Sequence, residues 1–120
     1  MGNSIIIKLF LCIESGDELI GIKVEKIDHL ISKAIGYPER SGVYVSNVFP
    51  SIVGDLLGLY SGDIILSVKD KPINDPHKLV DLMIESEGIG ETVLKVLDRD
   101  RYQKVKLLPI RLKKVIAFDI

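Results

Sequence analysis

Apolar residues along this chain fall into short runs separated by turn-forming residues, a pattern typical of a domain built mostly of strands. The first run, Ile5–Ile13, carries apolar side chains at nearly every position and predicts a strand buried on both faces. The later runs are bounded by Gly, Asp, Asn or Pro, which favour turns. They predict strands at about Ile20–Glu25, Val43–Val48, Ile64–Val68, Pro72–Ile73, Thr92–Leu97 and Gln103–Leu112.

Three segments between these strands show helical spacing of their apolar residues. The first lies within Asp28–Gly36, where the aspartate is expected to cap the helix and the glycine to end it. A helix of one or two turns is expected over Ile52–Leu57, after Ser51. A longer helix is expected to begin after Asn74 or Asp75, with a proline in its first turn. This pattern predicts an α+β fold: a small, partly open β-barrel or sandwich of five or six strands with two or three helices.

Composition and charge narrow the function classes. The chain has 120 residues, enough for one domain, with 47% hydrophobic and 28% charged residues, as in folded globular proteins. A formal net charge of −1 argues against general binding to nucleic acids or anionic membranes. We interpret the one basic cluster, Arg111, Lys113 and Lys114, as the solvated end of a strand. We therefore expect no nucleic-acid partner.

Side chains that could carry catalysis or bind a metal are sparse. Cys12 is the only cysteine, so no internal disulfide is possible. We interpret it as a small buried hydrophobe, because no activating base lies near it in the sequence. The His, Asp and Glu residues show no spacing typical of a metal site. The sequence therefore predicts neither an enzyme nor a cofactor.

The amino terminus imitates a targeting signal without completing one. Ile5–Ile13 resembles the core of a signal peptide, but Lys8 interrupts it, no small-residue cleavage site follows, and it is too short to span a bilayer. We expect no signal peptide and no membrane span here. Residues 1–18 are predicted to form an apolar extension, either an extra strand or a linker. A main domain at 19–112 and a tail at 113–120 follow.

Several segments of the chain are informative because of their order and spacing. They are Ile20–Ile22, Gly42–Ser51, Gly58–Val68, Lys71–Ile73, Leu79 and Gly90–Val93. With these segments in this order, the chain resembles a PDZ domain over about Leu19–Leu112, most closely the bacterial form attached to Deg/HtrA-type proteases. The family often has Asn-Gly where Lys69 and Asp70 stand, so the turn there is expected to differ in type.

The resemblance implies a peptide-binding module that works by β-augmentation. An extended peptide would add as an antiparallel strand beside Ile22–Glu25, whose backbone edge would otherwise be unpaired. Its terminal carboxylate would be held by the backbone N–H groups of Ile20, Gly21 and Ile22, with the glycine allowing a tight loop. The last apolar side chain of the ligand would enter a pocket formed by Ile20, Ile22, Val80 and Met83.

Each implied residue also has a structural interpretation. Gly21 belongs either to a carboxylate-binding loop or to a bend in a strand. Val80 and Met83 line either the groove or the core, because one helix faces both. His77 lies near the start of that helix, where some PDZ domains read a ligand Ser or Thr, and an exposed structural role is the alternative. The implied peptide-binding residues are Ile20, Gly21, Ile22, Lys23, Val24, His77, Val80 and Met83.

The carboxyl terminus suggests a ligand within the chain itself. Phe118, Asp119 and Ile120 end the sequence with an apolar residue and a second one two positions earlier, a pattern suited to an apolar-preferring PDZ groove. The residues beyond Leu112 can reach about 26 Å. The tail could therefore occupy its own groove or that of another copy. An ordinary packed or frayed tail is the alternative.

Two functions stay open at this point. The first is a peptide-binding module that captures C-terminal peptides or unfolded protein segments, as a regulatory or substrate-recruiting part of a protease or scaffold. The second is an assembly domain that uses Ile5–Ile13 or the tail as an intermolecular ligand. The expected compartment is periplasmic or membrane-associated if the chain belongs to a larger processing protease, and cytoplasmic otherwise.

Overall fold

The structure is a computed structural model that describes residues 5–14, 18–49 and 57–119. The helix expected over Ile52–Leu57 lies outside this part of the chain, except for its last residue. The described elements, in chain order, are β1 (Ile6–Ile13), β2 (Glu18–Lys26), α1 (His29–Ile35), β3 (Val43–Phe49), β4 (Ile64–Val68), β5 (Lys71–Pro72), α3 (Pro76–Glu85), β6 (Glu91–Leu97) and β7 (Val105–Asp119).

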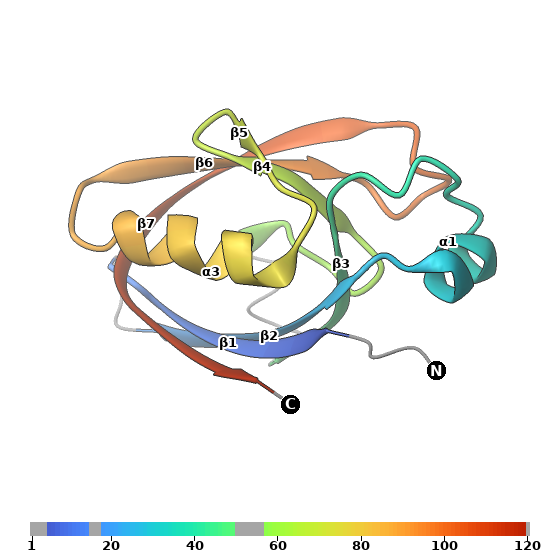
Figure 1. Ribbon diagram of the computed structural model, residues 1–120. Helices are drawn as coiled ribbons and strands as arrows, with labels where there is room; N and C mark the ends of the chain where they lie inside the picture. Colours follow the sequence, from blue (N-terminus) through green and yellow to red (C-terminus); the bar gives the residue numbers. More distant parts are fainter. Residues whose placement is uncertain (1–4, 15–17, 50–56, 120) are drawn as a thin grey trace.

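The strands form one antiparallel sheet that is partly closed on itself. Its order is β3-β2-β1-β7-β6-β4-β5, and a short pairing of β3 with β4 brings the sheet round toward a barrel. Helix α3 lies between the upper strands β4, β5 and β6 and the lower strands β1 and β2 (Figure 1). The α+β class is confirmed. The sheet has seven strands where five or six were expected, because β1 is a full member of it.

The helix ends follow the capping residues closely. The Asp28 carboxylate accepts a hydrogen bond from the Ile31 N–H at 2.9 Å, and Gly36 ends α1 with a φ of 72°. Asp75, not Asn74, caps α3, and Pro76 occupies its first turn. The Asn74 side chain accepts a hydrogen bond from the Gly42 N–H at 3.1 Å instead, which ties two loops together.

The turn between β4 and β5 differs from the family pattern in sequence but keeps a tight hairpin. Lys69 and Asp70 have φ values of 53° and 64°, in the left-handed region. A two-residue hairpin turn of type I′ has positive φ at both central positions, where Asn-Gly is favoured. Lys and Asp adopt this geometry at some cost in strain, and the β4–β5 pairing is short.

The core is built by alternate residues of the strands. Ile7, Leu9 and Leu11 of β1 point inward and are fully buried, since successive side chains of a strand lie on opposite faces. They pack with inward residues of the other strands and with the buried face of α3. Further members of this core include Ile20, Ile22, Val24, Val45, Ile65, Leu79, Leu82, Met83, Leu94, Val96, Ile110 and Leu112.

A second buried region is polar and lies at the β6–β7 end of the molecule. The fully buried carboxylate of Asp63 accepts hydrogen bonds from the N–H groups of Tyr60 and Arg99, both at 2.9 Å, and pairs with Lys106 at 2.9 Å. A hydrogen bond from the Asp100 N–H, helped by the charge of Lys106, holds the pKa of Asp98 below its usual value. The two backbone N–H groups and Lys106 satisfy the buried carboxylate of Asp63, which therefore stabilises the turn.

Tyr102 borders this region and shows how closely it is packed. Its hydroxyl donates to the Gly62 carbonyl at 2.7 Å, and its ring lies 5.5 Å from that of Tyr37. Burial, together with the nearby Tyr44 and Asp63, raises the pKa of Tyr102. In the described part of the chain, no helix has both the length and the apolar character needed to cross a membrane.

Candidate binding surface

The strand edge expected to receive a peptide is occupied. β2 pairs with β3 on one side and with β1 on the other, from Ile6 opposite Glu25 to Ile13 opposite Glu18. This corrects the expectation of an unpaired edge along Ile22–Glu25. The cause is the amino-terminal segment, which forms an antiparallel hairpin with β2 and buries its own apolar side chains. An incoming strand has no free backbone edge to join here.

The expected carboxylate loop lies inside this sheet. Ile20 and Ile22 point inward and are buried, while Gly21 pairs with Phe10 of β1 and Phe49 of β3. The Gly21 backbone is extended, so its conformation does not require glycine. A Cβ at this position would lie 3.0 Å from Phe49 Cδ2 and 3.2 Å from Phe10 Cε1. The glycine therefore makes room for two aromatic rings, and not for a tight loop.

The helix residues of the expected pocket contribute to the core. Met83 is fully buried in the same cluster as Ile20, Ile22 and Val24, and Val80 is partly buried against that cluster. His77 is exposed in the first turn of α3, where its Nδ1 lies 3.2 Å from the Asp75 carboxylate. The structure thus brings most of these residues together, with Ile20, Ile22 and Met83 buried in the core and Val80 packed against it.

The carboxyl-terminal residues do not reach β2. Residues 113–119, expected as a tail, continue β7 and pair with β1, so that Phe118 lies opposite Lys8 and Asp119 opposite Ile7. Asp119 also lies 3.5 Å from His77 Nε2. The segment therefore occupies a place beside β1, one strand away from the groove expected to bind it. Ile120 lies outside the described residues.

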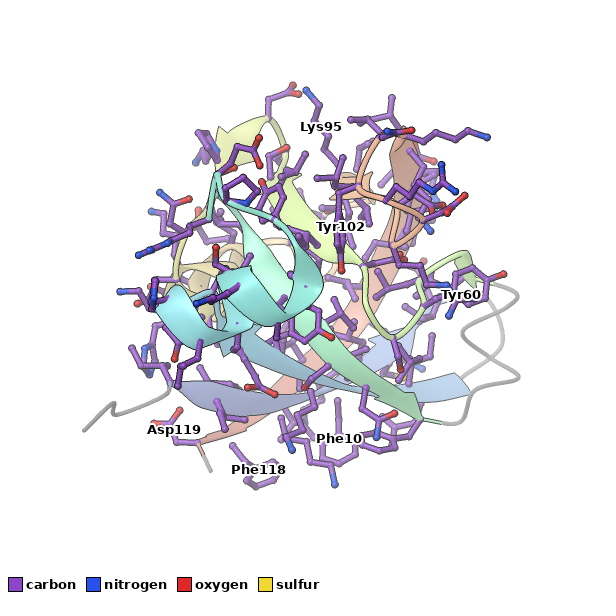
Figure 2. The ribbon with its side chains drawn as sticks, turned by 90° about the vertical axis from the view of Figure 1, so that its right-hand side faces the viewer. Phe10, Tyr60, Lys95, Tyr102, Phe118 and Asp119 are labelled. Atoms are coloured by element: carbon purple, nitrogen blue, oxygen red, sulfur yellow. The ribbon has the colours of Figure 1, made fainter. Side chains whose placement is uncertain are left out.

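The opposite side of the same strands is open. We call it the outer face: the surface formed by the side chains that point away from the core on β2, β1 and the second half of β7, together with Phe49 at the end of β3. Figure 2 shows Phe10 and Phe118 on the lower strands, at the opposite end of the view from Lys95. The outer face comprises Ile6, Lys8, Phe10, Cys12, Leu19, Gly21, Lys23, Glu25, Phe49, Lys114, Ile116 and Phe118.

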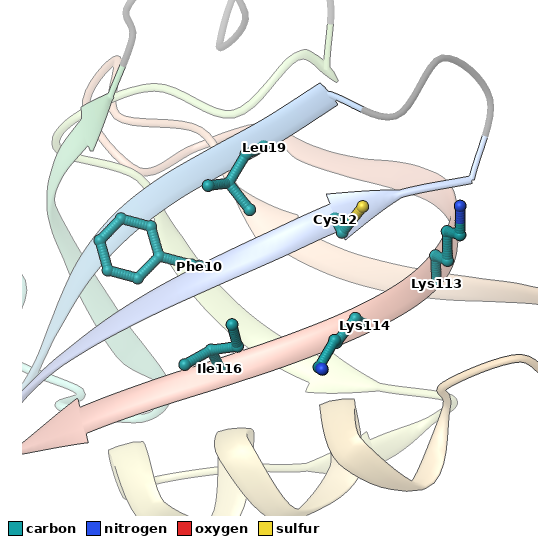
Figure 3. Close-up of a pocket in the computed structure, with 6 residues that line it drawn as sticks. All are labelled: Phe10, Cys12, Leu19, Lys113, Lys114 and Ile116. Carbon is teal, nitrogen blue, oxygen red and sulfur yellow. The ribbon is translucent and has the colours of Figure 1, made fainter.

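Side chains of the outer face, most of them apolar, line a shallow cavity of about 400 Å³ that is open to solvent. Leu19 and Phe118 are each 54% exposed and Ile116 is 41% exposed, although all three are large and apolar. Phe10 stands edge-on to Phe118, with ring centroids 5.9 Å apart. The cavity is lined by Phe10, Cys12, Leu19, Lys113, Lys114 and Ile116 (Figure 3).

Positive charge accompanies this apolar surface. Lys8 and Lys23 lie directly opposite each other on β1 and β2. The Lys8 ammonium lies 4.9 Å from the Phe49 ring centroid and 5.3 Å from that of Phe10. Across the described ranges, no ion pair neutralises Lys8, Lys23 or Lys114. The outer face therefore combines an apolar cavity with three lysines and one carboxylate, that of Glu25, so positive charge prevails on it.

Sequence reasoning missed this surface because the first strand was interpreted as buried on both sides. Its inward residues are buried, but Lys8, Phe10 and Cys12 are only partly covered. The signal was the lysine at one of the alternate positions, since a charged side chain seldom faces a core. Cys12, expected to be a small buried hydrophobe, is likewise only partly buried.

Comparison with known proteins shows that most of this chain is similar to a segment of two bacterial proteases. No protein-family model matches the chain. Over 93 residues, or 78% of the chain, it is 29% identical to a DegP-like probable periplasmic serine endoprotease of Rickettsia conorii. Over 79 residues, or 66% of the chain, it is 28% identical to the magnetosome formation protease MamE of Paramagnetospirillum magneticum. The aligned segments span only 18% and 11% of those two proteins.

Two features bear on metal binding and on buried charge in the described residues. In the ranges that the structure covers, no group of three or more His, Cys, Asp or Glu side chains is placed to hold a metal ion. The buried carboxylate of Asp63 is already bonded to two backbone N–H groups and to Lys106. What the geometry provides is a surface that can bind.

Proposed function

We propose that this chain is a non-catalytic, PDZ-like module that binds peptides or unfolded protein segments in the context of a protease. The observation that carries the proposal is the extent of the similarity. It covers most of this chain but less than a fifth of either protease, which is what a shared binding domain would give. The α+β sheet with a helix packed inside its curve supports the same proposal.

Strand addition to β2, the mechanism that the family resemblance implies, would require β1 to leave. That would expose Ile7, Leu9 and Leu11, each fully buried. Exposing three such side chains costs about 5–9 kcal/mol. A micromolar peptide gains about 8 kcal/mol in total. With β1 in place, binding through side chains on the surface of the domain is therefore the better supported mechanism.

The assembly alternative draws no support from these contacts. Both segments proposed as intermolecular ligands are paired within the chain: β1 with β2 and β7, and residues 113–119 with β1. A compartment follows only by analogy. One relative is named as periplasmic, and a periplasmic or membrane-associated location would suit a module of such a protease.

A peptide titration tests the proposal. Peptides of varied sequence, each with a free and an amidated carboxyl terminus, and one reduced, unfolded protein would be added to the ¹⁵N-labelled chain while amide shifts are followed. We expect saturable shifts with dissociation constants of about 1–100 μM. Amidation should change affinity little, because the N–H groups of Ile20–Ile22 lie within the sheet. Failure of every peptide and of the unfolded protein to bind would overturn the proposal.

A further inference from the structure

We propose that the outer face is a docking site for an acidic, apolar segment of a partner protein. A bulky apolar side chain of that segment enters the cavity beside Phe10, and its carboxylates bind Lys8, Lys23 and Lys114. The inference rests on the proposed function and deepens it, by naming where the partner binds and what its chemistry is. It places the partner over the strands and leaves the β1–β2 pairing intact.

The cavity provides the apolar contacts of the proposed docking site. About 400 Å³ lies within the range of sites that hold small ligands or anchoring side chains. Leu19 and Ile116 border it and are largely exposed, so covering them releases apolar surface from water. Concave apolar sites of this kind are where the anchoring residues of a partner bind.

Lys8 and Lys23, which lie opposite each other, provide the positive charge of the proposed docking site. Two like charges directly opposite each other across strands are destabilising, and an acid in either position would relieve this. The Lys8 ammonium is attracted to the Phe10 and Phe49 rings, which holds the charge next to the apolar surface. A carboxylate bound between Lys8 and Lys23 would cancel the repulsion, so the site gains more from an acidic partner than from a neutral one.

Charge also disfavours a second copy of this chain as the occupant, because lysines outnumber carboxylates among the residues of the outer face. In a two-fold dimer built on the outer face, the same patch meets itself. Lys8, Lys23 and Lys114 of one copy would then face the same lysines of the other, and like charges across an interface cost affinity. The outer face is complementary to an acidic surface and not to itself.

A bilayer is the less favoured occupant for two reasons. Lipid surfaces are typically recognised by clusters of four to eight Lys or Arg residues. The outer face carries Lys8, Lys23 and Lys114 together with Glu25, and the whole chain carries a net charge of −1, so its positive charge is weaker than that of such a cluster. A cavity bordered by Phe10 and Leu19 also fits a single protruding side chain better than a flat lipid surface.

The test uses the full chain, ¹⁵N-labelled, and three short amidated peptides. The acidic peptide has one Phe flanked by glutamates. The basic peptide has lysines in place of the glutamates, and the truncated peptide has Ala in place of the Phe. We expect the acidic peptide to shift amides of the outer face, and the other two to bind at least about ten-fold more weakly.

Substitutions separate this surface from the rest of the molecule. Lys23→Glu and Ile116→Ser should each weaken the acidic peptide about ten-fold. Lys95→Glu makes the same charge change on exposed β6, and Leu107→Ser makes a comparable apolar-to-polar change on exposed β7. Both controls should leave the affinity within about two-fold. Melting curves check that each variant is folded.

Cys12 gives a readout that needs no substitution. It is the only cysteine and lines the cavity, so its rate of alkylation by a maleimide reports occupancy. Saturating acidic peptide should slow that reaction several-fold, and the basic peptide should not. An unchanged rate at saturation would contradict insertion of the Phe side chain.

The remaining outcomes are also decisive. If the acidic peptide binds but shifts only residues away from the outer face, the docking site is wrong and the proposed function stands. The docking site is also wrong, and the proposed function stands, if peptides of other sequence bind and the acidic peptide does not. If no peptide binds, both proposals fail. If phosphatidylglycerol vesicles bind in a way that Lys23→Glu abolishes, and the peptides do not bind, the surface is a lipid site and the inference is overturned.

Discussion

The two faces of β2 differ sharply in exposure and in charge. Ile20, Ile22 and Val24 point inward and are at most 2% exposed. Leu19 and Lys23, which alternate with them, point outward beside the rings that cover Gly21. The inward residues specify the fold, and the outward ones leave an apolar, cationic surface open. A single strand thus supplies both the core and the candidate binding surface.

The difference shows that a peptide-binding edge cannot be inferred from the strand that would carry it. Whether β2 has a free edge depends on β1, a segment outside the family resemblance. With β1 paired along it, the residues expected to hold a ligand become core. The surface that remains available is the outer face, which is made by alternate side chains of three neighbouring strands.

The largest expected effect tests whether β1 belongs to the core. Leu9→Ala removes a fully buried side chain and should lower the free energy of unfolding by about 2–5 kcal/mol, because it leaves a cavity. Chemical denaturation measures the change. Leu107→Ala, at a 63% exposed position, is the control and should stay within about 0.5 kcal/mol. A cost below about 1 kcal/mol for Leu9→Ala would mean that β1 is peripheral and can leave β2.

The next effect compares two lysines. Lys106 neutralises the buried carboxylate of Asp63, whereas no acid in the described residues neutralises Lys23. Lys106→Met should cost about 1–3 kcal/mol, since two backbone N–H groups still bind the carboxylate. Lys23→Met should cost nothing or stabilise slightly. Equal costs in urea denaturation would contradict the contrast between a buried and an uncompensated charge.

A smaller effect is expected where the two faces meet, at Gly21. Gly21→Ala should change the free energy of unfolding by less than about 1 kcal/mol. The reason is that better strand propensity offsets the displacement of the Phe10 and Phe49 rings. Ring proton shifts should change although stability does not. A loss of several kcal/mol would show that the position requires glycine for its backbone, as a carboxylate loop would.

The smallest expected effect is a rise in the free energy of unfolding, whereas the largest effects are losses. Lys23→Glu places an acid opposite Lys8 and should stabilise the fold by about 0.2–1 kcal/mol. The gain should shrink with added salt, since the interaction is partly exposed. Thermal unfolding at low and high ionic strength measures it. The same variant is expected to weaken binding of the acidic peptide, so destabilisation by Lys23→Glu would remove the evidence for a strained lysine pair.

Much of the fold was predictable because local rules determine it. The caps at Asp28 and Asp75 and the extent of most strands follow from short-range preferences that tertiary contacts did not override. The end of β7 was not predictable. Lys113 and Lys114 interrupt its alternation, and a register shift after Cys12 absorbs the irregularity. Only the pairing partner shows that the strand continues.

The candidate binding surface could not be predicted from the sequence, for a related reason. Which side of a strand faces solvent depends on register, and a shift by one residue exchanges the two sides. Lys8 and Lys23 are fifteen positions apart in the sequence and meet only because β1 and β2 form a hairpin in one register. Phe118 joins them from the far end of the chain. No local pattern contains that information.

Amide hydrogen exchange on the chain, free and saturated with the acidic peptide, tests the central claim most directly. That claim is that β1 closes the β2 edge and that partners bind across the outer face. We predict that the β2 amides exchange only through global unfolding in both states, while peptide binding perturbs the neighbourhood of Phe10 and Lys23. Exchange of β2 through a separate opening of β1, made more frequent by the peptide, would contradict it.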